Sequence, residues 1–120
     1  MLIKDFVLKA ISQDERNVFE EIESEINNLP SELETFYKYA NPIDVEVSMG
    51  GNSVRFYQMD ELKNLQLDYK LPKGRFVFAT CNSDPIYIFN GKIYSCYHGN
   101  TNAKDEFVAD DFEDFLGLID

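Results

Sequence analysis

The dipeptide Asn90–Gly91, which stands between two apolar runs, constrains the fold of this chain more than any other short feature. Both central residues of a type I′ turn adopt positive φ angles, which asparagine and glycine tolerate, so the pair predicts a hairpin with a two-residue loop. Such a loop sets the register of the two strands, so Phe89 lies opposite Lys92 and Tyr87 lies opposite Tyr94.

The predicted register also assigns the hairpin side chains to the two faces of a sheet, since successive side chains in a strand point to opposite sides. One face carries Tyr87, Phe89, Tyr94, Cys96 and His98, and the other carries Asp84, Ile86, Ile88, Ile93, Ser95 and Tyr97. Neither face is polar throughout. We therefore expect a central hairpin that is covered on both sides for part of its length.

Before the strands, the chain has a helical pattern. Apolar residues at helical spacing predict a first helix over residues 2–11. A capping box formed by Ser12 and Glu15 predicts a second helix through about residue 27, with an apolar stripe made of Val18, Ile22 and Ile26.

A third helix is predicted after the Leu29–Pro30 turn, where Ser31 and Glu34 form another capping box. It ends at Asn41–Pro42, because a proline disfavours the helical conformation in the residue before it. Its spacing predicts four buried side chains, Leu33, Phe36, Tyr37 and Ala40.

The apolar pattern then changes to alternation, which predicts strands. Residues 44–49 and 53–57 form a hairpin with inward-facing Val45, Val47, Met49, Val54 and Phe56. A short helix over residues 59–67, a strand over residues 75–80 and the Asn90–Gly91 hairpin follow, and a last strand leads into a helix that buries Phe112, Phe115, Leu116 and Ile119. This order predicts one α+β domain over residues 1–120, with a twisted, mostly antiparallel sheet flanked by helices.

The charge is strongly acidic and unevenly placed. The formal net charge is −11, and the excess lies in residues 14–34, with eight acids and one base, and residues 104–120, with seven acids and one base. A free nucleic acid or an anionic membrane would be repelled, whereas a basic protein would be attracted. The alternative, which charge alone leaves open, is an acidic surface that only keeps the protein soluble.

Cys81, Cys96 and His98 raise the question of a reactive or metal site. Cys96 is predicted opposite Pro85, about 13 Å along the strand from Cys81, whereas a disulfide needs Cα atoms within about 7 Å unless the chain turns sharply at residues 82–84. Cys96 and His98 point the same way but stand about 7 Å apart, and the ligand spacing of a zinc site is missing. We expect packed thiols, no metal, no cofactor and no enzymatic activity.

Three segments together resemble the SUKH superfamily, which includes the fungal Smi–Knr cell-wall assembly regulators and many bacterial immunity proteins. They are "FEEIESEINNLPSELETFYKYANP", "FVFATCNSDPIYIFNGKIYSCYHG" and "FVADDFEDFLGLI". The resemblance implies a twisted sheet flanked by helices, and it makes Asp84 the acid between the paired central strands. The chain departs from the superfamily at two positions. Ser83 stands where the superfamily often has a glycine before the aspartate, and Pro42 follows Asn41 where the superfamily often has a glycine after the asparagine.

The function that the resemblance implies is an intracellular immunity protein that binds and neutralises a toxin domain, commonly a nuclease or a deaminase. Such a partner carries a basic surface, and an acidic protein can occupy or flank it. The expected contact residues are Asp84, Tyr87, Tyr94 and Tyr97, with Asp60 and Glu61 at the rim. For each tyrosine, packing in the core is the alternative.

Two other functions remain open on the sequence. One is a regulatory or scaffold module like the fungal relatives, and the other is a small enzyme or metal protein. No apolar run approaches the roughly 20 residues of a transmembrane helix, and residues 1–12 lack the pattern of a signal peptide. We expect a cytoplasmic protein with reduced thiols, either a monomer or a weak homodimer.

Overall fold

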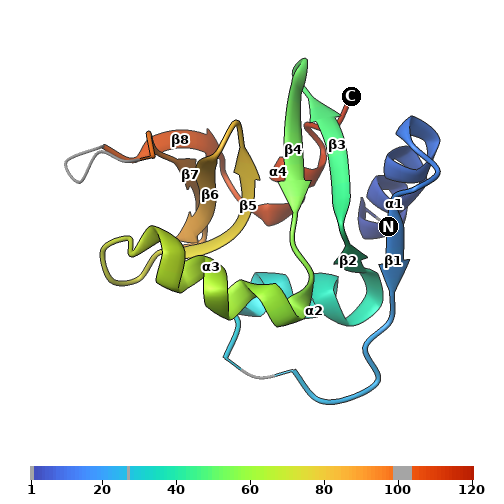
Figure 1. Ribbon diagram of the computed structural model, residues 1–120, viewed down its shortest axis with the longest axis horizontal. Helices are drawn as coiled ribbons and strands as arrows, with labels where there is room; N and C mark the ends of the chain where they lie inside the picture. Colours follow the sequence, from blue (N-terminus) through green and yellow to red (C-terminus); the bar gives the residue numbers. More distant parts are fainter. Residues whose placement is uncertain (1, 27, 99–103) are drawn as a thin grey trace.

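Six antiparallel strands, each paired with the next one along the chain, form the main sheet (Figure 1). They are β3 (Val45–Met49), β4 (Asn52–Phe56), β5 (Phe76–Cys81), β6 (Asp84–Phe89), β7 (Lys92–Ser95) and β8 (Glu106–Ala109). The computed structural model describes residues 2–26, 28–98 and 104–120. Together with the helices around this sheet, the strand order confirms the predicted α+β fold.

In the part of the chain that the structure describes, four α-helices and a two-stranded sheet surround the main sheet. The helices are α1 (Leu2–Gln13), α2 (Ser31–Ala40), α3 (Leu62–Tyr69), which follows the short 3₁₀ helix η1 (Met59–Glu61), and α4 (Phe112–Leu116). The small sheet pairs β1 (Val18–Glu20) with β2 (Asn41–Ile43). We call the side of the main sheet that carries Phe56 and Ile86 the inner face, and the side that carries Arg55 and Tyr87 the outer face. In Figure 1, α3 lies in front of the sheet on the outer face and α4 lies behind it.

The hairpin predicted from Asn90–Gly91 is confirmed. Phe89 pairs with Lys92 and Tyr87 pairs with Tyr94, and the two loop residues have φ angles of 52° and 79°. The ladder ends at Ser95, so the predicted pair of Pro85 with Cys96 is not part of the sheet. The loop chemistry therefore determined the register of the strands next to it.

A second tight turn joins β5 to β6. Asn82 and Ser83 both have positive φ angles, 52° and 70°, and Cys81 pairs directly with Asp84. Asparagine tolerates this conformation, whereas serine is strained there because its Cβ approaches the following carbonyl. Ser83 therefore occupies a position whose backbone favours glycine.

The predicted helix over residues 12–27 is wrong. After α1 the chain turns at Asp14–Asn17, forms β1 and then runs without helix through Ile26. Two contacts oppose the helix: the Phe19 ring packs against Phe6 at 6.0 Å, and the Ile22 N–H donates to the Lys38 carbonyl. Clustered glutamates four residues apart, such as those at positions 21 and 25, also disfavour a helix. Contacts with residues distant in the sequence therefore determine the structure of this segment, and its apolar stripe does not form a helix.

The third predicted helix is confirmed as α2, and its four predicted apolar side chains are buried. Its capping box is wrong, however. Pro30 occupies the N-cap position, no side chain caps the helix, and the Pro30 carbonyl accepts the first helical hydrogen bonds from Leu33 and Glu34. The capping box predicted at Ser12 is wrong as well, because Ser12 lies inside α1 and starts no helix.

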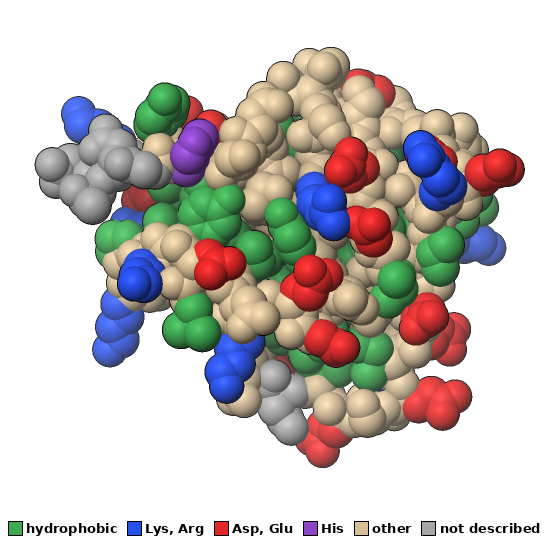
Figure 2. Space-filling model, in the orientation of Figure 1, with side chains coloured by type: hydrophobic (Ala, Val, Ile, Leu, Met, Phe, Trp, Pro, Cys, Tyr) green, Lys and Arg blue, Asp and Glu red, His purple; other side chains and the backbone are tan. Residues whose placement is uncertain are grey.

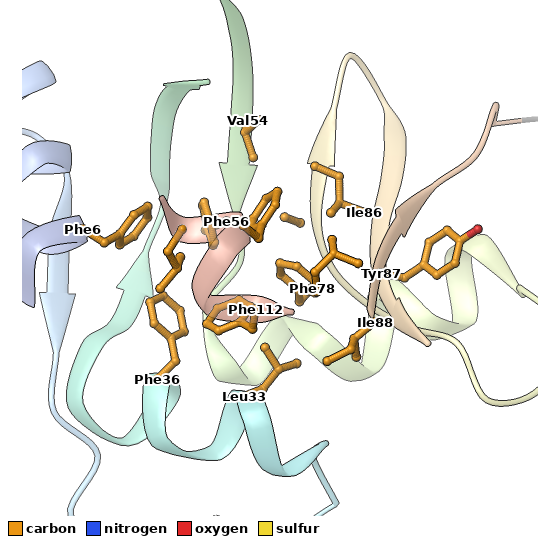
Figure 3. Packing of buried hydrophobic residues seen from close by; sticks show 14 of the residues in the cluster. Phe6, Leu33, Phe36, Val54, Phe56, Phe78, Ile86, Tyr87, Ile88 and Phe112 are labelled. Atoms are coloured by element: carbon orange, nitrogen blue, oxygen red, sulfur yellow. The ribbon is translucent and has the colours of Figure 1, made fainter. Parts of the chain in front are cut away.

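A cluster of six phenylalanines fills the space between the inner face and the helices. Figure 3 shows Phe6, Phe36, Phe56, Phe78 and Phe112 gathered there, while Tyr87 points to the opposite side of the sheet. Some neighbouring rings are close to perpendicular, as for Phe78 and Phe112, whose centroids are 5.3 Å apart, whereas other pairs in the cluster are tilted. Phe115 completes the cluster. Edge-to-face contacts of this kind add about 0.5–1.5 kcal/mol each beyond the area that the rings bury.

Helix α3 is held on the outer face by a side-chain amide. Gln66 donates to the Val77 carbonyl (2.7 Å) and accepts from the Val77 N–H (2.8 Å). Val77 lies at an irregularity in the pairing of β5 with β6, where backbone groups would otherwise be left unpaired. The contact fixes α3 beside the part of the outer face described next.

Candidate functional site

The outer face of β3, β4 and β5 forms a polar hollow of about 310 Å³. Its floor comes from residues that alternate with the core residues of these strands, because Val54 and Phe56 point inward and Arg55 and Tyr57 outward. Tyr69 of α3 and the turn at Asn82–Ser83 form its wall. The complete lining is Glu46, Ser53, Arg55, Tyr57, Tyr69, Thr80, Asn82 and Ser83. We call this surface the outer hollow.

Hydrogen bonds hold the hydroxyl groups of the outer hollow in place. The Tyr57 and Thr80 hydroxyls are 3.0 Å apart, and the Tyr69 hydroxyl donates to the Ser83 carbonyl at 2.6 Å. Burial is the main cause that raises the pKa of Tyr69, so this phenol stays protonated and remains a donor. The hollow is therefore a surface with fixed polar groups.

Arg55 is the cation of the outer hollow, and acidic side chains surround it. Its guanidinium lies 3.6 Å from the Glu46 carboxylate, forms an ion pair with Asp44 and covers the Tyr57 ring at 5.5 Å. One guanidinium shared by two carboxylates leaves an excess of negative charge. Figure 2 shows acidic side chains spread over this side of the molecule.

The chemistry of the outer hollow suits binding. Its lining contributes hydroxyls, an amide, a carboxylate and a guanidinium, and neither a cysteine nor a histidine is part of it. Across residues 2–26, 28–98 and 104–120, no group of three His, Cys, Asp or Glu side chains is placed to hold a metal ion. Fixed donors and acceptors of this kind match the polar contacts of a protein interface.

Asp84, the predicted acid between the central strands, connects the turn after β5 to the segment after β7. One carboxylate oxygen accepts from the His98 backbone N–H at 2.9 Å, and the ring Nδ1 of His98 lies 2.6 Å from the same oxygen. Burial raises the pKa of Asp84, but the hydrogen bonds from His98 more than offset it and hold the pKa below its usual value. Tyr97 stacks on the His98 ring, with centroids 5.4 Å apart, and is 67% exposed.

Tyr87 does not lie on the surface, which corrects the expectation that it is an exposed contact residue. Its side chain is fully buried, and its hydroxyl donates to Asp105, which also binds Arg75 at 2.6 Å. The hydrogen bond from Arg75 is the main cause that lowers the pKa of Asp105. Tyr94 is half-buried and stacks on Tyr87, with centroids 6.3 Å apart.

The remaining predicted contact residues, Asp60 and Glu61, lie in η1 at the start of α3. Asp60 is exposed and Glu61 is half-buried. Asp84 lies next to Ser83, whose carbonyl binds Tyr69 at the other end of α3. The acids predicted as one surface therefore stand at opposite ends of this helix, with Asp84 at the end that borders the outer hollow.

Sequence reasoning missed Arg55, Tyr57, Tyr69 and Thr80, which dominate the outer hollow. The first two could have been found, because they alternate with the inward-facing residues of a correctly predicted strand. Tyr69 carries no such signal, since its position depends on how α3 packs across β5.

Both cysteines are free. The sharp turn at Asn82–Ser83 does occur, yet the thiols stay apart because they lie on opposite faces. Cys81 lines a groove on the inner face together with Ile86 and Ser95, whereas Cys96 is buried beside Tyr87 on the outer face. Burial is the main cause that raises the pKa of both thiols, which keeps them neutral and poorly nucleophilic near pH 7.

The fold and the outer hollow define an α+β domain with a polar hollow, bordered by acidic side chains, on one face of an antiparallel sheet. The family model described as the SMI1 / KNR4 family (SUKH-1) matches residues 15–118, and the chain belongs to this family. This match confirms the resemblance to the SUKH superfamily. A comparison with curated proteins found no match. None of the described helices is long and apolar enough to cross a membrane.

Proposed function

We propose that this protein is an immunity protein that binds a cognate bacterial toxin domain, a nuclease or a deaminase, in a one-to-one complex inside the cell and thereby neutralises it. Membership of the SMI1 / KNR4 family over residues 15–118 is the observation that carries the proposal. The superfamily that this family belongs to includes many such immunity proteins. The protein acts by occupying a surface of the toxin and performs no reaction of its own.

The charge of the chain supports a basic partner. The formal net charge of −11 attracts a basic protein over the range of a Debye length and accelerates its encounter. Nucleic-acid enzymes carry basic substrate channels, so a surface of carboxylates can bind where the phosphates of the substrate would bind.

The outer hollow is our candidate for the centre of the contact. Its tyrosines are fixed by hydrogen bonds to Thr80 and Ser83, so little side-chain freedom is lost when a partner binds. Asp84 and the exposed Tyr97 extend the contact beyond the turn, with the exposed part of Tyr94 as a further candidate. Asp60 and Glu61 are rim candidates, whereas the buried Tyr87 is not part of the proposed contact.

The test uses the toxin domain encoded next to this gene. The toxin and this protein are purified separately, their stoichiometry and affinity are measured by calorimetry, and toxin activity is assayed with and without the protein. We expect a one-to-one complex and loss of toxin activity. Absence of binding, together with absence of protection of cells that express the toxin, would overturn the proposal.

A charge reversal locates the contact. Glu46→Lys changes an acid of the outer hollow, and Glu25→Lys makes the same change at an exposed position in the segment after β1. We expect Glu46→Lys to weaken binding by at least about tenfold and Glu25→Lys by no more than about twofold. Equal effects of the two variants would mean that net charge alone drives binding.

The second candidate function is a regulatory or scaffold module like the fungal cell-wall assembly regulators, and the family match favours it as well. It also uses a binding surface, but its partner is a protein of the host cell. A gene neighbourhood without a toxin gene, and no protection against any toxin, would favour this candidate over the first.

A further inference from the structure

The main sheet has two edge strands, β3 and β8, and the structure treats them differently. An edge strand presents a row of backbone N–H and C=O groups that can pair with another chain. At β3 side-chain amides close the edge. Asn17 pairs with the backbone of Glu46, and Gln13 pairs with the backbone of Ser48, whose carbonyl also accepts from the Asp120 N–H.

No comparable closure is present at β8 among the described residues. Its only strand partner among the described residues is β7. On the edge of β8 that faces away from β7, no described backbone or side-chain group forms a hydrogen bond with residues 106–108. The strand is nevertheless held at both ends. Arg75 binds Asp105 just before it, and Lys92 binds Asp110 just after it at 3.4 Å. A fixed and open edge is the arrangement that accepts an added strand.

Apolar surface lies on both sides of β8. On the outer face, Phe107 is 58% exposed and contacts Tyr94 edge to face at 6.2 Å. On the inner face, Val108 lines an apolar groove of about 350 Å³ that continues past Ser95 and Ile86 to Leu118, which is also exposed. We call it the inner groove. An added strand presents its side chains alternately to the two faces, so one set could pack against Phe107 while the other lies along the end of the inner groove beside Val108. The aliphatic part of a basic side chain can also cover apolar surface.

The negative charge near β8 favours a basic segment as the added strand. Residues 104–120 contain seven acids and one base, and Glu106 pairs with Ser95, so its carboxylate is exposed on the same side as the inner groove. A second copy of this chain would bring Glu106 and Asp110 against the same acids, which is unfavourable. A basic strand would be attracted.

We propose that the β8 edge binds an extended peptide segment of a partner protein, in which apolar and basic residues alternate, by adding it as a seventh strand. This inference goes beyond the proposed function and holds for either candidate, because it concerns a second surface that is separate from the outer hollow. Main-chain hydrogen bonds to β8 contribute affinity, and Phe107, the inner groove and Glu106 contribute selectivity.

The experiment uses the full chain and two synthetic peptides of about eight residues, the length of a typical strand with a margin at each end. The first alternates lysine and valine. The second has the same side chains with every backbone nitrogen methylated, so that it keeps the charge but cannot donate a main-chain hydrogen bond. Amide shifts and amide hydrogen exchange of the ¹⁵N-labelled protein are followed by NMR during titration.

We expect the first peptide to shift the amides of β8 and to slow their exchange by at least about tenfold at saturation, because a pairing strand protects them. The methylated peptide should leave exchange at β8 unchanged. Glu106→Lys should weaken binding of the first peptide at least about fivefold, and Glu25→Lys, its charge-matched control, by less than about twofold.

Three outcomes would overturn the inference. They are equal binding of the two peptides, shifts confined to the outer hollow, and no shift at millimolar peptide. Dimerisation of the free protein through β8, detected by sedimentation and by slower exchange of the β8 amides at higher protein concentration, would make a second copy the occupant and would also overturn it. The experiment contains no toxin, so its result is independent of the test of the proposed function.

Discussion

The side-chain amide of Asn17 forms hydrogen bonds with both backbone groups of Glu46, donating to its carbonyl at 2.8 Å and accepting from its N–H at 3.1 Å. One side chain thereby takes the place of a neighbouring strand at the edge of the sheet. The same amide donates to the carbonyl of Ala10 in α1 at 2.9 Å, so Asn17 joins the first helix to β3. This arrangement requires the chain to leave the helix before residue 17.

Replacing Asn17 by alanine should destabilise the protein by about 2–3 kcal/mol, because three hydrogen bonds are lost and buried backbone groups are left without partners. Urea denaturation followed by circular dichroism measures the change. Asn64→Ala, at an exposed position on α3, is the control and should change stability by less than about 0.5 kcal/mol. Equal stability of the two variants would contradict the role assigned to Asn17.

Replacing Ser83 by glycine should stabilise the protein. Ser83 has a φ angle of 70°, and relief of this conformation contributes about 1 kcal/mol once the greater freedom of glycine in the unfolded chain is subtracted. The hydrogen bond from Tyr69 survives, because it involves the Ser83 carbonyl. Thermal denaturation should show a higher midpoint.

Ser53→Gly provides the comparison for this prediction. Ser53 lies within β4, where glycine weakens a strand by roughly 0.5–1 kcal/mol. The two serine-to-glycine substitutions should therefore shift the midpoint in opposite directions. A lower midpoint for both would show that Ser83 is not strained in its turn.

The contact between Asp84 and His98 should make stability depend on pH on the acid side. The folded-state pKa of Asp84 is lowered from 3.8, so the unfolded chain takes up the proton first as the pH falls. The stabilising contribution is complete above this value and is lost as the pH falls through the lowered pKa.

Asp84→Asn isolates this contribution, because the amide oxygen can still accept from the His98 N–H. The free energy of unfolding of Asp84→Asn and of the unmodified protein is measured between pH 2 and pH 7. The difference between them should be constant above pH 4 to 5 and should shrink at lower pH. A difference that stays constant down to pH 2 would mean that the carboxylate charge contributes nothing.

The two tyrosines Tyr87 and Tyr97 should respond in opposite ways to substitution. Tyr87→Phe removes a hydroxyl that donates to Asp105 in a buried network, so it should lower stability by about 1 kcal/mol and leave toxin binding unchanged. Tyr97→Ala removes an exposed ring and should leave stability unchanged while weakening binding. Denaturation and calorimetry on both variants separate the two effects, and a binding loss for Tyr87→Phe at full stability would contradict the placement of Tyr87.

The sequence by itself determined the parts of the fold that depend on neighbours in the chain. Asn90–Gly91 specified a turn and with it a register, and alternation identified which residues of β3 and β4 face the core. The same alternation placed Arg55 and Tyr57 on the outer face, although their role there was not predicted. These features follow from backbone sterics and from the two-residue period of a strand, which act locally.

Tertiary structure decided the rest. Residues 14–26 carry a helical stripe, yet the Asn17 amide and the pairing of β1 with β2 supply hydrogen bonds that a helix there would forgo. Tyr87 and Tyr97 have the same side chain, but Tyr87 lies within β6, is buried and donates to Asp105 of the Asp105–Arg75 pair. Tyr97 lies beyond the end of β7 and is exposed. Partners distant in the sequence set both outcomes, because burial and hydrogen bonding depend on what folds against a residue.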